Sequence, residues 1–82
     1  MPNPFPDIYL ERRDHLRNMA RFYAVSIECD LLGDTVAVRR WGRIGTHGQS
    51  LKIAYSDAAL ANVDLLALLA AKRRRGYRPV AG

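Results

Sequence analysis

The residues of this sequence best suited to chemistry are residues 40–45, which read Arg-Trp-Gly-Arg-Ile-Gly. They place the single tryptophan of the chain, Trp41, between two arginines and beside a Gly-x-x-Gly pair, where the backbone can turn and approach another surface closely. A guanidinium next to an exposed aromatic ring is suited to gripping phosphate and sugar. A tryptophan at a strand end can instead fill the core, so the pattern leaves both roles of Trp41 open.

The charge balance points to the kind of partner. Lysine and arginine outnumber aspartate and glutamate by 13 to 8 among 82 residues, giving a formal net charge of +5 at pH 7. In one small domain this balance favours a polyanion such as nucleic acid. No run approaches the ~18–20 apolar residues of a membrane span, and no signal peptide is visible. The lone Cys29 fits a reducing cytoplasm, and we expect it to be a small buried apolar side chain.

Catalytic and metal-binding chemistry has few residues available. His15 and His47 are far apart in sequence, and neither stands in a ligand-spaced cluster with cysteine or carboxylates. Acidic residues are scattered singly, without an obvious pair for general acid and base catalysis. Gly42, Gly45 and Gly48 lack the Lys and Ser/Thr of a phosphate loop and precede a strand. We therefore expect no enzymatic activity, no catalytic residue, no cofactor and no metal site.

Three alternating stretches predict the strands that must position these residues. They cover residues 23–29, 35–41 and 49–55, with turn chemistry at Gly33-Asp34 and glycines between the second and third. An antiparallel meander is the simplest way to connect them. In the second strand, alternation places Ala37, Arg39, Trp41 and Arg43 on one face and Val36, Val38 and Arg40 on the other.

A helix is predicted to follow the third strand. It starts at Ser56 as N-cap, runs to about Arg74, and ends with Gly76 as C-terminal cap. The basic run from Lys72 to Arg75 is favourable at the helix C-terminus for electrostatic reasons alone, and is equally suited to phosphate contact. The residues predicted to share the core-facing side are Ala59, Val63, Leu66, Leu69 and Ala70.

This helix is apolar nearly all round, because between residues 58 and 71 only Asn62 and Asp64 are polar. Leu60, Leu65 and Leu68 lie off the centre of the predicted face. Such a helix needs cover on more than one side. We expect that cover from the N-terminal segment, which carries Phe5, Ile8, Tyr9 and Leu10. A homodimer contact through the helix around Leu68 is the alternative.

The N-terminal residues 1–18 are predicted to be an extension of the domain. Three prolines in the first six residues exclude regular helix and weaken strand pairing. Residues 8–10 have the character of a short strand, and residues 11–18 that of a loop or one helical turn. The predicted organisation is an extension at 1–18, one domain at 19–78 and a tail at 79–82.

These motifs together resemble a WGR domain, a family named after the Trp-Gly-Arg that stands here at 41–43. The resemblance rests on residues 40–45, Gly48-Gln49, a strand start at 21–23, and Lys72-x-x-x-Gly76-Tyr77 at the helix end. It covers roughly residues 18–78, and the stretch before it is similar to small stand-alone bacterial members. It implies an α+β fold in which a small antiparallel sheet has one long helix packed across it, in agreement with the pattern above.

The resemblance also implies a function. In the nuclear poly(ADP-ribose) polymerases this domain helps to sense DNA breaks. The motif tryptophan there packs against the sugar of a terminal nucleotide, and the motif arginine sits near the DNA end or a neighbouring domain. In some members, a tyrosine after the helix and an asparagine before the first strand approach the terminal phosphate. These roles fall here on Trp41, Arg43, Tyr77 and Asn18, whereas ADP-ribose transfer is not implied, because this sequence contains no such catalytic domain.

We therefore expect a non-enzymatic module that binds DNA ends or nicks with little sequence specificity, since phosphate and sugar contacts read no base edges. Cationic side chains would neutralise phosphates, and the tryptophan would offer a flat face to a terminal sugar or base. RNA is an alternative ligand, and a protein-interaction module using the apolar helix is the alternative function. The residues expected to contact nucleic acid are Trp41, Gly42, Arg43, Arg39, Lys52, Tyr77 and Asn18.

Overall fold

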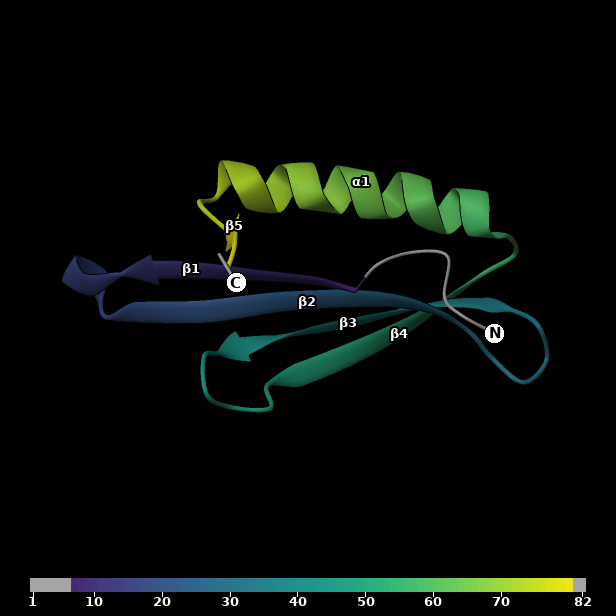
Figure 1. Ribbon diagram of the computed structural model, residues 1–82, viewed down its shortest axis with the longest axis horizontal. Helices are drawn as coiled ribbons and strands as arrows, with labels where there is room; N and C mark the ends of the chain where they lie inside the picture. Colours follow the sequence, from purple (N-terminus) through teal and green to yellow (C-terminus); the bar gives the residue numbers. More distant parts are fainter. Residues whose placement is uncertain (1–6, 81–82) are drawn as a thin grey trace.

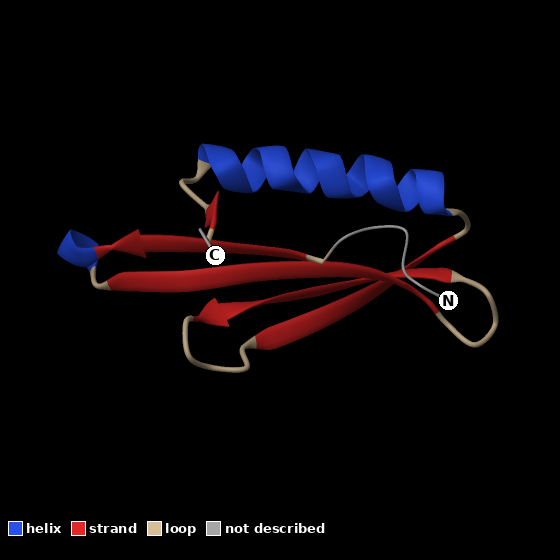
Figure 2. Cartoon of the chain, viewed as in Figure 1, coloured by secondary structure: helices blue, strands red, loops and turns tan. Residues whose placement is uncertain are grey.

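The computed structural model describes residues 7–80, which form one antiparallel sheet with a single long helix on one of its faces (Figure 1). The five strands lie in the order β4-β3-β2-β1-β5. The predicted α+β fold is confirmed, with the strands in one layer and the helix in the other (Figure 2). The elements in chain order are β1 (Ile8–Asp14), the short 3-10 helix η1 (His15–Arg17), β2 (Met19–Cys29), β3 (Thr35–Arg43), β4 (Gln49–Tyr55), α1 (Ala58–Arg74) and β5 (Arg78–Pro79).

The central meander forms as its alternation predicts. β2 pairs with β3 and β3 with β4, all antiparallel, with Tyr23 opposite Trp41 and Ile27 opposite Ala37. Successive side chains of a strand point to opposite faces, so the apolar residues of these strands gather on the face that meets the helix. The core between sheet and helix consists of Leu10, Tyr23, Val25, Ile27, Ala37, Ala61, Leu65 and Tyr77.

β1 departs from the sequence prediction. Residues 11–14, expected in a loop or helical turn, continue the strand of residues 8–10, and only η1 is helical. β1 pairs along its whole length with β2, and its other edge pairs with β5 at Leu10 and Glu11. The prediction is wrong because the charged residues suggested solvent-exposed irregular chain, whereas pairing with β2 and burial of Leu10 decide the local structure.

The cover predicted from the N-terminal segment lies within the sheet layer. Leu10 is buried in the core, and Ile8 packs against it from the same face. Tyr9 faces the other way and stacks on Phe22, with ring centroids 5.9 Å apart. Phe5 lies outside the described residues. Residues 8–10 therefore extend the core along the sheet and do not cover the outside of the helix.

The two ends of α1 are set by local chemistry. The N-cap is Asp57, whose carboxylate accepts a hydrogen bond from the Leu60 N–H at 3.0 Å, so the prediction of Ser56 is wrong by one residue. At the other end Gly76 adopts a φ of +97°, and the Tyr77 N–H donates to the Lys72 carbonyl at 3.1 Å. This Schellman-type turn returns the chain to the sheet, where Tyr77 enters the core.

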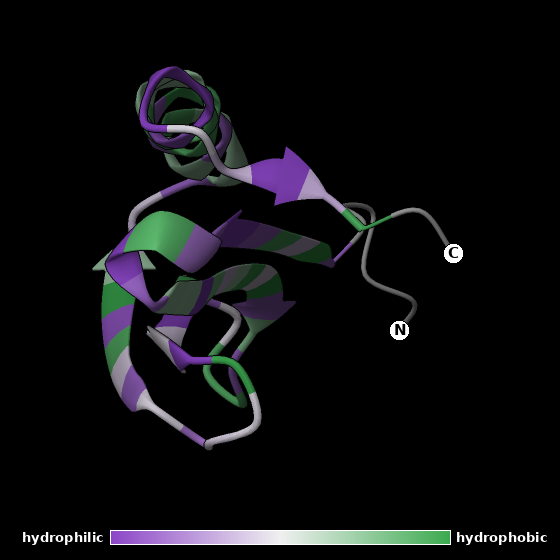
Figure 3. Cartoon of the chain, turned by 90° about the vertical axis from the view of Figure 1, so that its left-hand side faces the viewer, coloured by the Kyte–Doolittle hydropathy of each residue, from purple (hydrophilic) through white to green (hydrophobic). Residues whose placement is uncertain are grey.

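The face of α1 that meets the sheet is not the predicted one. Ala61 and Leu65 are buried, whereas Val63 and Leu66 of the predicted core face are exposed. Leu69 of the predicted face does pack against the core, and so does Leu68, around which the alternative homodimer contact was expected. Each helical residue adds about 100° of rotation, so the observed face is rotated away from Val63 and Leu66 and shares only Leu69 with the predicted one. The prediction failed because an all-round apolar helix gives no periodic signal from which to choose. Seen from the end, α1 covers one face of the sheet, and no helix formed by residues 7–80 covers the other (Figure 3).

Cys29 is also placed differently from the prediction, because its thiol is exposed. It is the last residue of β2, beside the β2–β3 turn, where the core cover of the strand has ended. The alternation of β2 places Cys29 on the buried face of the strand. It does not indicate at which residue the packing over that face ends. No helix among residues 7–80 has the length and apolar character that crossing a membrane would need.

Candidate nucleic-acid interface

A hollow of about 530 Å³ opens where the ends of β1, β2 and β3 meet the C-terminal end of α1. In Figure 1 these ends lie together at the left of the molecule. The lining contains six cationic residues and no aspartate or glutamate. Its residues are Arg12, Arg17, Asn18, Met19, Ala20, Arg21, Phe22, Trp41, Gly42, Arg43, Lys72, Arg75 and Tyr77.

Three of these cations form a row across three strands. Arg12 of β1 is the register partner of Arg21 of β2, and Arg21 is the register partner of Arg43 of β3. Register partners project from the same face, so the three side chains lie side by side. We call these residues the arginine row. Among residues 7–80 none of the three makes an ion pair, whereas Arg17 pairs with Asp14 at 3.6 Å.

Such a row is electrostatically costly. Like charges directly opposite each other on adjacent strands are destabilising, and no carboxylate of the hollow offsets them. The free side chains therefore present guanidinium donors to whatever anion enters. A phosphate matches those donors in charge and geometry, because guanidinium can hold two of its oxygens at once.

The helix adds Lys72, held between two aromatic rings. Its ammonium lies 4.4 Å from the ring centroid of Tyr23 and 5.2 Å from that of Tyr77. Burial lowers the pKa of Lys72 below its ordinary value, and the nearby charges of Arg75 and Arg39 lower it further. An anion in the hollow would reverse part of this shift by favouring the charged form.

Trp41 combines the two roles that the sequence left open. It stacks on Tyr23, with ring centroids 6.4 Å apart and an interplanar angle of 18°, and packs against the core. It is only partly buried, and it lines both the large hollow and a neighbouring one of about 210 Å³. Packing against Tyr23 holds one side of the indole ring in place. The part of the ring that lines the hollow can therefore contact a ligand without a further loss of side-chain entropy.

Gly42 has a scaffolding role within the motif. A Cβ added to Gly42 would lie 2.8 Å from the Cα of Gly48, so the two glycines pass each other in close contact. Gly48 itself has a φ of +74°, and a Cβ there would overlap the carbonyl oxygen of Trp41. The backbone around the tryptophan can therefore close only because both residues lack side chains.

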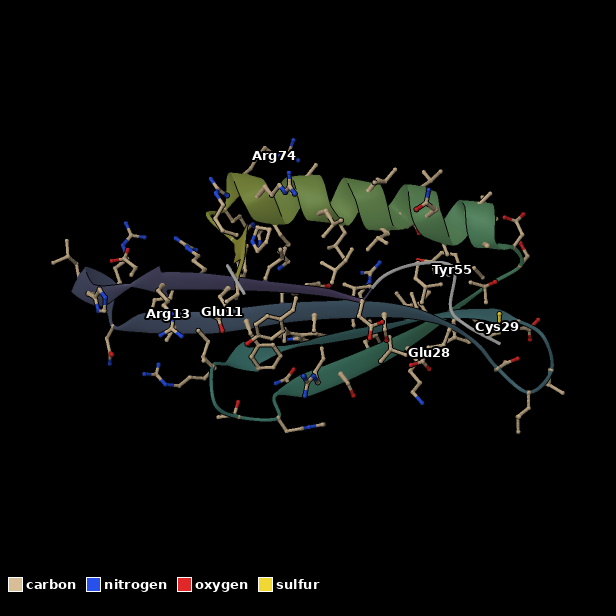
Figure 4. All side chains as sticks on the ribbon, viewed as in Figure 1. Glu11, Arg13, Glu28, Cys29, Tyr55 and Arg74 are labelled. Atoms are coloured by element: carbon tan, nitrogen blue, oxygen red, sulfur yellow. The ribbon has the colours of Figure 1, made fainter. Side chains whose placement is uncertain are left out.

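The predicted contact residues do not all meet. Trp41, Gly42, Arg43, Tyr77 and Asn18 line the large hollow. The other two predicted cations lie elsewhere. Arg39 lines the neighbouring hollow, and Lys52 lines a third one with Glu28 and Cys29. Figure 4 shows Glu28 and Cys29 away from Glu11 and Arg13, toward the β2–β3 turn.

Sequence reasoning missed part of the cationic lining. The predicted contacts did not include Arg12, Arg17 or Arg21. For Lys72 and Arg75 the sequence allowed two roles, as favourable charges at the helix end and as phosphate contacts. A signal for Arg12 exists, because it continues the alternation of Ile8 and Leu10. Arg21 is in phase with Tyr23 in the same way. What the sequence lacked was the register, which brings the two arginines together.

Two cations near the hollow have other roles. The Arg40 guanidinium lies on the opposite face of the sheet, 5.1 Å from the ring centroid of Phe22, which it helps to cover. Arg74 projects from α1 away from the sheet (Figure 4). Among residues 7–80, no three His, Cys, Asp or Glu side chains gather in a way that could hold a metal ion.

Comparison with known proteins identifies the family. The family model described as WGR domain matches residues 6–82. The chain belongs to the WGR family. In poly(ADP-ribose) polymerases this domain is a nucleic-acid-binding module. The motif that names the family is here residues 41–43, so this WGR chain places its motif Trp and Arg in the lining of the basic hollow.

A curated relative of this WGR chain is the uncharacterized protein y4dW of Sinorhizobium fredii (strain NBRC 101917 / NGR234). The two are 51% identical over 72 residues, which make up 88% of this chain and 35% of the relative. The chain thus spans about a third of the length of the curated relative that it matches. No solved structure matches the chain significantly.

Proposed function

We propose that this WGR chain is a non-enzymatic module that binds DNA ends or nicks through phosphate and sugar contacts, with little sequence specificity. The observation that carries the proposal is the hollow in which Trp41 lies beside the uncompensated arginine row, to which the motif residue Arg43 belongs. The family adds support, because WGR domains of poly(ADP-ribose) polymerases bind nucleic acid.

The arginine row supplies the binding energy in this proposal. Adjacent strands lie about 4.8 Å apart, so three guanidinium groups extend over roughly 10 Å at the rim of the hollow. That distance suits one to three phosphates of a single backbone strand. Each neutralised phosphate releases counterions, so the affinity should fall with salt at a logarithmic slope of about −0.9 per phosphate contact.

Trp41 supplies the preference for an end. An internal nucleotide is stacked on both sides, whereas a terminal one leaves its sugar and one face of its base open to an aromatic ring. Contacts of this kind are worth ~1–3 kcal/mol per base in single-strand systems. Because Trp41 is already held against Tyr23, the contact requires no further ordering of the ring.

Fluorescence anisotropy with labelled DNA tests the proposal. A blunt 5′-phosphorylated duplex is compared with the same duplex closed by hairpins at both ends, at low and moderate salt. We expect salt-sensitive binding that is at least about fivefold tighter to the open duplex, and Trp41→Phe to keep more of this preference than Trp41→Leu. Equal binding to both duplexes would reject the preference for DNA ends. An absence of binding at low salt would reject the proposal that the chain is a DNA-binding module. A matching RNA duplex tests the alternative ligand.

A further inference from the structure

The outward side of α1 carries an apolar surface that no described residue covers. Leu60, Val63 and Leu66 are 51%, 63% and 59% exposed. Alanines on the same side are exposed as well, and the residues that we call the outer stripe are Ala59, Leu60, Val63, Leu66, Ala67 and Ala70. Their spacing follows the helical repeat, on the side opposite the buried Ala61 and Leu65.

The outer stripe is unusual for a helix that lies on the surface of a small protein. The outer face of such a helix is normally polar, and contiguous exposed apolar residues mark an interaction site. The polar residues of the helix middle lie beside the stripe, where Asp64 accepts a hydrogen bond from the Tyr55 hydroxyl at 2.8 Å. The stripe itself contains no polar side chain between Ala59 and Ala70.

The stripe is complementary to a second copy of itself. Its midpoint lies between Val63 and Leu66, so an antiparallel arrangement places Ala59 of each copy opposite Ala70 of the other, and Val63 opposite Leu66. In the same arrangement the N-terminal end of one helix, capped by Asp57, lies beside the C-terminal end of the other, which carries Arg73 and Arg74. Arg74 projects away from the sheet (Figure 4). A parallel arrangement would instead bring like charges together at both ends.

We propose that two copies of this chain associate through their outer stripes, with the α1 helices antiparallel. One two-fold axis covers both stripes and sets each acidic helix start beside a basic helix end, so the contact closes at a dimer. A helix of 17 residues is about 25 Å long, so the contact area is at the low end for specific interfaces. We expect a reversible dimer with a dissociation constant on the order of 10 µM.

The dimer leaves the basic hollow of each copy free. The hollow opens at the ends of the sheet strands, and its helical lining residues Lys72 and Arg75 come from outside the stripe. This arrangement would give the dimer two separate hollows, which matters for DNA only if the proposed function also holds. Self-association is measured without DNA, so the two proposals succeed or fail independently.

Sedimentation equilibrium between about 5 µM and 1 mM protein tests the dimer. The variant Leu66→Glu places a charge in the stripe, and Leu31→Glu is the matched control, because Leu31 is fully exposed at the β2–β3 turn. We expect wild type and Leu31→Glu to dimerise with the same constant and Leu66→Glu to stay monomeric at 1 mM. A monomeric wild type at 1 mM, or a Leu66→Glu variant that dimerises like wild type, overturns the proposal.

Cysteine pairing tests the orientation with variants that keep the stripe apolar. In a Cys29→Ser background, Ala59→Cys and Ala70→Cys are prepared separately and then mixed under oxidising conditions. The two positions are about 16 Å apart along the helix, so in the antiparallel dimer a disulfide forms only between the two different variants. Cross-linking of each variant with itself, or none in the mixture, contradicts the antiparallel contact.

Discussion

Arg21 and Arg43 are direct register partners on β2 and β3, and neither makes an ion pair among residues 7–80. Arg12 continues the same row on β1. A sheet selected for stability alone would place an opposite charge or an apolar residue at one of these positions. In the proposed function, the missing counter-charge is supplied by the phosphates of the ligand.

The first prediction concerns DNA affinity. Arg21→Gln and Arg43→Gln should each weaken binding about tenfold at moderate salt and reduce the salt slope by about 0.9, because each removes roughly one phosphate contact. Lys52→Gln is the matched control, since it removes the same charge from a different hollow. Anisotropy titrations at four salt concentrations measure the slopes. An equal effect of Lys52→Gln would mean that net charge, not the arginine row, drives binding.

The second prediction concerns stability without DNA. Arg21 has an arginine on either side, so Arg21→Gln should stabilise the fold by about 0.2–1 kcal/mol by relieving like-charge repulsion. Urea denaturation at low salt measures the change, and the gain should shrink as salt screens the charges. A loss of stability at all salt concentrations would show that Arg21 contributes packing that outweighs the repulsion.

The third prediction concerns the glycines around Trp41. Gly48→Ala should destabilise the fold by about 1–3 kcal/mol more than Gly33→Ala, because a Cβ at Gly48 overlaps the Trp41 carbonyl. Gly33 is the matched control, since it also has a positive φ, +86°, but has open space around it. Thermal unfolding followed by circular dichroism compares the two variants. Equal losses would assign the whole cost to backbone conformation.

The fourth prediction concerns pH. Burial lowers the pKa of Lys72 below 10.5, so its charge is lost at a lower pH than that of a free lysine. Because the charged form attracts phosphate, DNA affinity should fall as alkaline pH removes the Lys72 proton, at a lower pH than a free lysine would require, by about tenfold at most. Lys72→Arg keeps its charge at alkaline pH and should bind with little pH dependence. A parallel fall in both proteins would place the titrating group elsewhere.

Some elements of the fold could be predicted from the sequence, and others could not. The strands β2, β3 and β4 were predictable, because their alternation matches a sheet with one buried face. The face of α1 was not, because Val63 and Leu66 are as apolar as the buried Leu65. Which leucine is buried depends on the chain direction imposed by the Asp57 cap and by the turn at Gly76.

The candidate site also contains residues that the sequence could predict and residues that it could not. The motif at residues 41–43 was visible in the sequence, as was Tyr77 after the helix. The arginine row was not, because Arg12 and Arg43 are distant in sequence and meet only through their common neighbour Arg21. Register is a property of strand pairing, and a single sequence specifies it only after the pairing partners are known.

The last prediction tests how the helix begins. Asp57→Ala should cost about 1 kcal/mol, because it removes the carboxylate that accepts the Leu60 N–H and leaves a helix-end donor without its protein partner. Ser56→Ala, the residue that the sequence pattern favours as N-cap, should change stability by less than about 0.5 kcal/mol. For a domain of this size the first change lowers the melting temperature by about 4–8 °C. If Ser56→Ala proves the more costly, Ser56 is the N-cap and the helix begins one residue earlier. The direction in which α1 leaves β4 would then differ, and the choice of the buried face of α1 would have to be reassigned.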